Sequence, residues 1–113
     1  MTNLARLQLE LANRQYLSEE QYSVLLDENG LDAVSEYTAA NRKSLLQTVL
    51  NVLEILSNDI DLFRKVETEF ATTSEAFSAL TTRIQTVKNK ISAIDAESGV
   101  VDGSVFSAMY FGG

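Results

Sequence analysis

The near absence of helix-breaking residues constrains this chain more than any other feature of its sequence. Proline does not occur in the 113 residues, and Gly30 is the only glycine before residue 99. Proline and glycine are the residues least favourable inside an α-helix, so long stretches without them favour long helices. Apolar residues make up 45% and charged residues 22% of the chain, which is typical of a globular domain rather than of a disordered segment. We therefore expect one all-α domain.

Two short helices are expected near the N-terminus. Residues 2–13 carry leucines at helical spacing, which predicts a short amphipathic helix. A second helix is expected over residues 19–29, because Ser18 and Gln21 form an S-x-x-Q capping box before it. Gly30 can adopt the left-handed conformation that ends a helix in a Schellman motif.

Two longer helices are expected over residues 38–57 and 73–95, with a short continuation of the first over residues 60–65 that Asp59 would cap. Each carries a stripe of apolar residues at alternating spacings of three and four, namely Leu46, Val49, Leu53, Leu56, Ile60 and Phe63 in the first and Phe77, Leu80, Ile84, Val87, Ile91 and Ile94 in the second. Such stripes predict that the two helices pack together at a shallow angle. The first is apolar on most of its circumference and is expected to be central. Residues 1–96 thus form a small bundle of four main helices.

The composition changes after Ala96, and residues 97–113 are expected to form an extended apolar arm outside the bundle. The large apolar residues of this arm are Val100, Val101, Val105, Phe106, Met109, Tyr110 and Phe111. Such a segment is an aggregation hazard in water, so it needs a surface that covers it. One interpretation is that it folds back over its own core. The other, which the glycines at 99 and 103 favour, is that it docks on another chain.

The sequence lacks the residue types on which most catalytic and metal sites depend. Histidine and cysteine are absent, which removes the commonest general base, the usual zinc ligands and any disulfide. No nucleophile-elbow, P-loop or dinucleotide-binding motif occurs. Only carboxylates remain, such as the pairs Asp59 and Asp61 or Glu67 and Glu69, and we interpret them as exposed surface acids. We expect no catalytic residue, no cofactor and no metal site; an enzyme that uses carboxylates alone is a lesser hypothesis.

The charges are numerous, mostly acidic and unevenly distributed. The net charge is -7, which disfavours binding to a nucleic-acid backbone or to an anionic membrane surface. Six acidic residues between Gln15 and Asn41, with no lysine or arginine among them, form a candidate acidic face: Glu19, Glu20, Asp27, Glu28, Asp32 and Glu36. This face is either a solvated surface, a contact complementary to basic residues of an identical subunit, or a wall that faces something it must not bind.

The N-terminal residues lack a basic stretch followed by an apolar run, so no signal peptide is expected. No apolar stretch approaches the ~20 residues of a membrane-spanning helix. We therefore expect a protein that stays in the cytoplasm or joins a particle assembled there.

Several stretches resemble the small helical head–tail connector proteins (adaptor or head-completion proteins) of tailed bacteriophages. They are Leu-Ser-Glu-Glu-Gln-Tyr at 17–22, Glu-Asn-Gly-Leu at 28–31, the apolar helix at 45–56 with Ser-Asn-Asp after it, and Glu-Phe-Ala-Thr-Thr-Ser-Glu-Ala at 69–76. The resemblance covers most of residues 4–95 and lies in helix lengths and caps rather than in a diagnostic motif.

The resemblance implies a virion protein that assembles in the host bacterial cytoplasm as a ring, commonly of twelve copies. Such a ring docks on the portal protein, extends the channel through which DNA passes without specific binding, and supports a tail or stopper protein. The family implies no active site and no membrane contact. The C-terminal arm would then dock on the portal or on a neighbouring copy, and the acidic face could line the channel. The alternative is a small oligomeric helical adaptor or regulatory protein that binds a partner protein through its heptad stripes.

Overall fold

The computed structural model describes residues 1–97 and is all-α, as the sequence predicts. In chain order the helices are α1 (Asn3–Glu10), α2 (Glu19–Glu28), the 3-10 turn η1 (Ala39–Asn41), α3 (Arg42–Asn58), α4 (Ile60–Glu67) and α5 (Thr73–Glu97). The four expected main helices are α1, α2, α3 and α5, and the expected short continuation is α4. Within residues 1–97 the only extended pairing is an isolated antiparallel bridge between Thr2 and Glu36.

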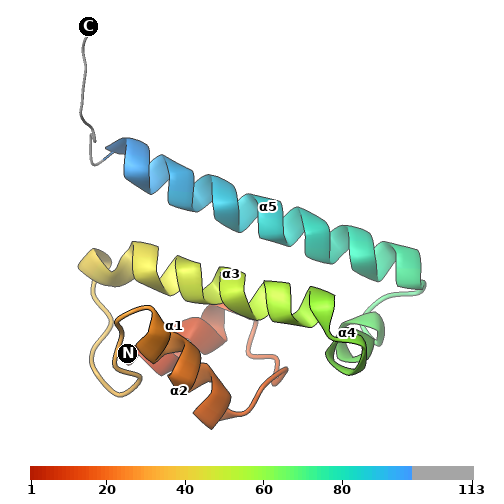
Figure 1. The fold of residues 1–113 in the computed structure, drawn as a ribbon, viewed down its shortest axis with the longest axis horizontal. Coiled ribbons are helices and arrows are strands. Elements are labelled where there is room, and N and C mark those ends of the chain that lie inside the picture. The colour runs from red at the N-terminus through yellow and green to blue at the C-terminus, as the bar shows by residue number, and fades with distance from the viewer. Residues whose placement is uncertain (98–113) are drawn as a thin grey trace, which may run out of the picture.

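Helix α3 is the centre of the body (Figure 1). Helix α5 lies along one side of it, and α1 and α2 lie on the other side. Apolar side chains around most of its circumference are buried: Leu45, Leu46, Val49, Leu50, Val52, Leu53 and Leu56. Burial on several sides confirms that the most apolar helix of the sequence is central.

Helices α3 and α5 pack antiparallel through the two predicted stripes. The stripe of α5 contributes Leu80 and Val87, which are buried, and Ile84, Ile91 and Ile94, which are partly buried against the same core. The ammonium group of Lys43, at the start of α3, lies 2.6 Å from the carboxylate of Asp95, near the end of α5. The stripes that could have joined two copies of the chain are therefore packed against each other inside one copy.

Local signals in the sequence set both ends of α2. The Ser18 hydroxyl accepts a 3.1 Å hydrogen bond from the backbone of Gln21, whose side chain accepts one of 2.9 Å from the backbone of Ser18. These two bonds complete the predicted capping box. At the other end Gly30 has a φ of 78°, and the backbone N–H of Leu31 donates to the carbonyl of Leu26 at 2.9 Å. This pattern is the Schellman ending that the sequence predicts.

The first helix is shorter than predicted, because α1 ends at Glu10 and not at residue 13. Ala12 and Asn13 have φ values of 57° and 58°, in the left-handed region that L-residues rarely adopt. The turn is closed locally, since the backbone N–H of Asn13 donates to the carbonyl of Gln8 at 2.8 Å, as that of Leu31 donates to Leu26 after α2. The hydroxyl of the buried Tyr22 holds the chain beyond this turn, because it donates to the carbonyl of Arg14 and accepts from the backbone of Leu17. Asparagine tolerates the left-handed conformation, but Ala12 gives no local signal for it.

The two stripes are also less completely buried than their spacing predicts. Ile60 is 73% exposed and Phe77 is 58% exposed. Asp59 adopts an extended conformation between α3 and α4, so the helical register of α3 does not continue into α4 and Ile60 leaves the stripe. Phe77 instead meets Phe63 edge-to-face, with ring centroids 6.5 Å apart, at the end of the body where α4 joins α5.

Candidate interaction surfaces

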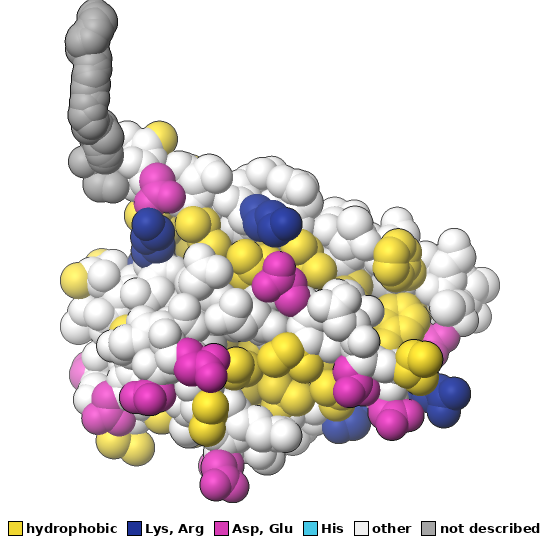
Figure 2. Space-filling view, in the orientation of Figure 1, with side chains coloured by type: hydrophobic (Ala, Val, Ile, Leu, Met, Phe, Trp, Pro, Cys, Tyr) yellow, Lys and Arg dark blue, Asp and Glu magenta, His cyan; other side chains and the backbone are white. Residues whose placement is uncertain are grey.

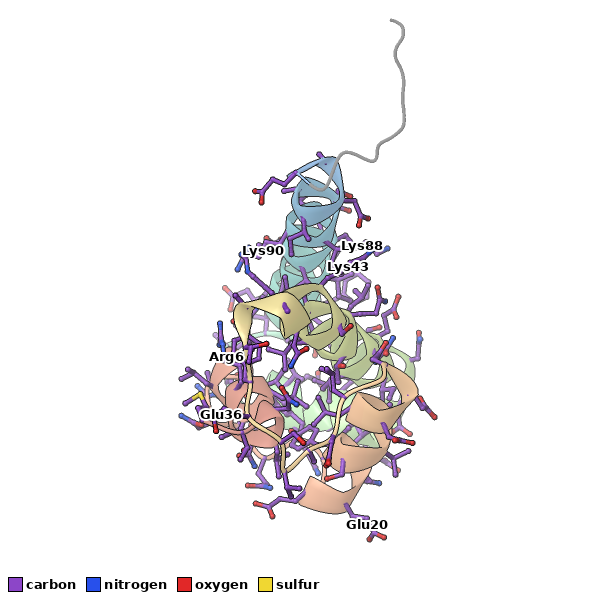
Figure 3. The ribbon with its side chains drawn as sticks, turned by 90° about the vertical axis from the view of Figure 1, so that its left-hand side faces the viewer. Arg6, Glu20, Glu36, Lys43, Lys88 and Lys90 are labelled. Carbon is purple, nitrogen blue, oxygen red and sulfur yellow. The ribbon has the colours of Figure 1, made fainter. Side chains whose placement is uncertain are left out.

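All six residues of the predicted acidic face are exposed, and they lie on α2 and on the connection that follows it. We call Glu19, Glu20, Asp27, Glu28, Asp32 and Glu36 the acidic surface. Figure 3 shows Glu20 at the edge of the body farthest from α5, and Glu36 on the same side of α3 as Glu20. No lysine or arginine side chain among residues 1–97 comes within 4 Å of any of these carboxylates.

The acids of α2 are not all placed to stabilise the helix. Glu19 and Glu20 occupy the first turn, where the helix dipole favours negative charge. Asp27 and Glu28 occupy the last turn, where the dipole disfavours it, and that turn carries no basic residue. The acids at this end therefore reduce the stability of the helix.

Two members of the acidic surface have partners within the chain. Glu36 lies 2.6 Å from the N-terminal ammonium group of Met1. The carboxylate of Asp32 accepts a 3.2 Å hydrogen bond from the backbone of Val34 and a 3.1 Å bond from the hydroxyl of Ser35. The Glu36 contact holds the connection between α2 and α3 against the N-terminus, whereas the Asp32 bonds close a turn within that connection.

The opposite charge lies on the other side of α3. From Ala76 to Ile94, α5 carries three cationic side chains and no acidic one, and we call Arg83, Lys88 and Lys90 the basic stretch. Figure 3 shows Lys88 and Lys90 projecting from the two sides of α5, at the end of the view opposite Glu20. Neither lysine pairs with a carboxylate among residues 1–97. The middle of α5 is therefore basic, and Glu75, Asp95 and Glu97 near its two ends offset these cations, so that α5 as a whole has no net charge.

An apolar groove lies between α2, α3 and α4, and sequence reasoning did not locate it. Its lining comes from Leu17, Gln21, Val24, Leu25, Ile55 and Leu62. Figure 2 shows hydrophobic side chains gathered on this face of the body, below the line of α3. The groove has a volume of about 280 Å³. The one sequence feature that relates to the groove is the position of Ile55, which lies beside the main stripe of α3 rather than on it.

The groove continues into a more polar hollow. Leu25 and Ile55 line both, and the polar hollow also has the side chains of Glu28, Glu54 and Asp59 on its wall. A ligand that filled both would place apolar groups in the groove and hydrogen-bond donors beside the carboxylates.

A polar cluster joins the connection before α2 to the end of α4. The hydroxyl of Tyr16 donates a 2.7 Å hydrogen bond to Glu69, and the ammonium group of Lys65 donates one of 3.0 Å to the carbonyl of Tyr16. The guanidinium of Arg14 lies 3.6 Å from the other oxygen of Glu69. Burial raises the pKa of the Tyr16 phenol above its usual value, and the hydrogen bond to Glu69 adds to this effect. The cluster holds two connections together, and all its charges have partners.

The four carboxylates of the lesser hypothesis, a carboxylate-only enzyme, have different surroundings in the structure. Asp59 caps α4 by accepting from the backbone of Leu62, and Glu67 accepts a 2.5 Å hydrogen bond from the hydroxyl of Thr73. Glu69 belongs to the polar cluster, and Asp61 is exposed in the first turn of α4. Among residues 1–97, no group of three or more acidic side chains is arranged to hold a metal ion.

The predicted arm residues from Val100 to Phe111 lie outside the described residues. Helix α5 continues to Glu97, the last described residue, two residues beyond its predicted end.

Comparisons with known proteins do not assign the chain to a family. No family model matches it, and no curated protein and no solved structure matches it either. None of the helices described in residues 1–97 is both long enough and apolar enough to cross a membrane. The fold thus defines a small all-α body with an acidic surface on the α2 side, three cations in the middle of α5 and an apolar groove.

Proposed function

We propose that this chain is a structural subunit of a head–tail connector ring of a tailed bacteriophage. In this role the ring docks on the portal protein, extends the DNA channel and supports a tail or stopper protein. It assembles in the host bacterial cytoplasm and becomes part of the virion. The proposal is supported by the resemblance of the stretches between residues 17 and 76 and by the charge distribution of the body.

The observation that favours a ring is that the acidic surface and the basic stretch lie on opposite sides of α3 in one body. The acidic surface lies on the α2 side and the basic stretch lies on α5, so the acidic side of one copy fits the basic side of the next. A contact between two unlike patches is heterologous, and it closes into a ring when the rotation between copies allows. Complementary charges also orient the partners before they meet.

A small oligomeric adaptor, held as a dimer by its heptad stripes, is the alternative. The stripes of α3 and α5 pack against each other inside one chain, with Val49 and Val87 almost fully buried. Contacts between copies would therefore use surface patches rather than the stripes. This favours a ring of complete bodies over a coiled-coil dimer.

The net charge of -7 per chain disfavours adhesion of DNA to the ring as a whole, because pairing of the acidic surface with the basic stretch of the next copy leaves the summed charge of the ring unchanged. Negative side chains repel the phosphate backbone, so DNA can pass without being held. The ring itself would be stabilised by contacts between subunits, and DNA would contribute nothing to its assembly.

Native mass spectrometry of the purified chain, alone and with the portal protein encoded by the same genome, tests the proposal. A ring of twelve copies of this 12.5 kDa chain would have a mass of about 150 kDa. We expect this species, or its complex with the portal, at low ionic strength. A chain that forms no ring and binds no portal would contradict the proposal, and a stable dimer without partners would favour the adaptor.

Charge-reversal variants test the contact itself. Lys88 and Lys90 project from the two sides of α5, so Lys88→Glu combined with Lys90→Glu reverses the charge on whichever side faces the acidic surface of the next copy and should abolish the ring. Adding Glu19→Lys and Glu20→Lys should restore it. Arg42→Glu combined with Arg64→Glu changes the net charge equally on other helices and should leave the ring intact.

A further inference from the structure

The apolar groove has no part in the charged contact proposed above, yet it exposes apolar surface to water. Val24 on its wall is 53% exposed. The volume of about 280 Å³ is roughly twice the ~150 Å³ of a cavity that holds a benzene ring. The groove is therefore large enough for one or two aromatic or branched side chains and too small for a helix.

We infer that this groove binds the C-terminal segment of a neighbouring copy, residues 100–111, with one or two of its aromatic side chains inserted. The inference rests on the proposed function in one respect, which is that copies contact each other through α5 and α2. Each chain then supplies one groove and one segment, so every segment in a closed ring has a groove.

The chemistry of the segment matches that of the groove. Residues 100–111 contain seven large apolar side chains, three of them aromatic, and burial of such side chains drives association. No charged residue occurs from 103 to 113, so the carboxylates of Glu28, Glu54 and Asp59 in the adjoining hollow do not repel this part of the chain. The hydroxyls of Ser104, Ser107 and Tyr110 offer donors to the same carboxylates.

The position of the end of α5 favours a neighbouring copy over the same copy. The end of α5 lies beside the start of α3, as the contact between Lys43 and Asp95 requires, whereas the groove is lined by Ile55 in the last turns of α3, roughly 18 Å away along the helix axis. Within one copy, the segment would have to reverse its direction and pass from the α5 side of the body to the α2 side.

Between copies no reversal is needed. If the basic stretch of one copy lies against α2 of the next, Glu97 is roughly 10–14 Å beyond Lys88 and Lys90 along α5. Three groove residues, Gln21, Val24 and Leu25, belong to that same α2. The segment that follows Glu97 therefore begins within reach of the neighbour's α2, which supplies half of the groove lining.

Disulfide trapping in the full-length chain tests the inference directly, because the chain contains no cysteine of its own. One preparation carries Val24→Cys, and a second carries a single cysteine at Val105, Phe106, Met109, Tyr110 or Phe111. After mixing and mild oxidation we expect a cross-linked dimer for at least one position of the series, since a disulfide forms only when the two Cβ atoms come within ~4.5 Å. Val34→Cys is the matched control, because Val34 is also an exposed valine (78%) but does not line the groove.

Absence of a cross-link across the whole series, or equal cross-linking of Val34→Cys, would overturn the inference. A chain that carries both cysteines could also form the disulfide within one copy. If this intramolecular disulfide forms equally well at high dilution, the groove binds the segment of the same copy and the inference is overturned. Val24→Asp should also weaken self-association by on the order of tenfold or more, whereas Leu9→Asp, on α1 and outside both the groove and the acidic surface, should leave it unchanged. Both positions are exposed, so circular dichroism should show folded protein in each case.

The outcomes separate this inference from the proposed function. If the chain forms a ring that binds the portal and Val24→Asp does not weaken that ring, the proposed function stands and the groove contact is excluded. If the disulfide forms between copies of a chain that binds no portal, the groove contact stands and the proposed function is excluded.

Discussion

The hydroxyl of Tyr16 donates a 2.7 Å hydrogen bond to the carboxylate of Glu69, across 53 residues of sequence. This bond ties the connection before α2 to the connection before α5. The left-handed turn at Ala12 and Asn13 lies in the same connection. The bond therefore helps to fix where α2 begins relative to α4, and these two helices form opposite walls of the apolar groove.

The pH dependence of stability tests this contact. The pKa of Tyr16 is raised in the folded state, so the folded chain holds the phenolic proton more tightly than the unfolded chain. The stabilisation is fully present below the usual tyrosine pKa of about 10 and is lost as pH rises above it. Tyr16→Phe should lower the free energy of unfolding by roughly 0.5–1.5 kcal/mol at pH 8, and this difference should shrink toward pH 11. Urea unfolding of both proteins across this range measures it; a constant difference would contradict the assignment.

The central position of α3 predicts a large effect of truncating its core side chains. Leu56 is fully buried, so Leu56→Ala should lower the free energy of unfolding by about 2–5 kcal/mol. Leu9→Ala removes the same atoms from a side chain that is 47% exposed and should cost much less, about 0.5 kcal/mol or below. Equal losses for the two variants in chemical denaturation would be incompatible with α3 at the centre.

Gly30 is needed for its backbone conformation and not for its small size. An added Cβ would meet no atom within 4 Å, but the φ of 78° is unfavourable for an L-residue. Gly30→Ala should therefore cost about 1–2 kcal/mol, and Gly30→Asn less, because asparagine tolerates this conformation. Thermal unfolding compares the two; a loss for alanine well above this range would indicate a steric clash instead.

The acids at the end of α2 predict a conflict between stability and assembly. Asp27→Lys replaces a charge that the helix dipole disfavours with one that it favours, so the isolated chain should gain about 0.3–1 kcal/mol of stability. The same change removes part of the acidic surface and should weaken the association of copies. Denaturation and sedimentation of one preparation measure both effects. A variant that is stabilised and still assembles normally would exclude Asp27 from the contact.

The parts of the fold that local sequence signals determine were predicted well. Ser18 and Asp59 cap the helices that they were expected to cap, and Gly30 ends α2 as expected. The helix stripes predicted the pairing of α3 with α5, because apolar periodicity reports which face of a helix is buried.

The features that were missed depend on tertiary contacts. The early end of α1 follows from the turn at Ala12 and Asn13, and Tyr22 of another helix holds the chain beyond this turn. The apolar groove needs side chains from three helices at once, and Val24 and Leu62 are 38 positions apart in sequence. No periodicity within one segment can indicate such a site. The six acids were predicted to be exposed together. The position of the basic stretch on the opposite side of α3 could not be predicted, because it depends on how α2 and α5 pack around α3.

The proposed association of copies joins the acidic surface of one body to the basic stretch of the next. Sedimentation velocity of the full-length chain at ~20 mM and ~500 mM salt tests it most directly, because the distance over which charges interact falls from ~20 Å to ~4 Å between these concentrations. We predict a ring-sized species at low salt that dissociates toward the 12.5 kDa monomer at high salt, and that is absent from the Lys88→Glu, Lys90→Glu variant at both. A chain that sediments as a monomer at every salt and protein concentration would contradict the account.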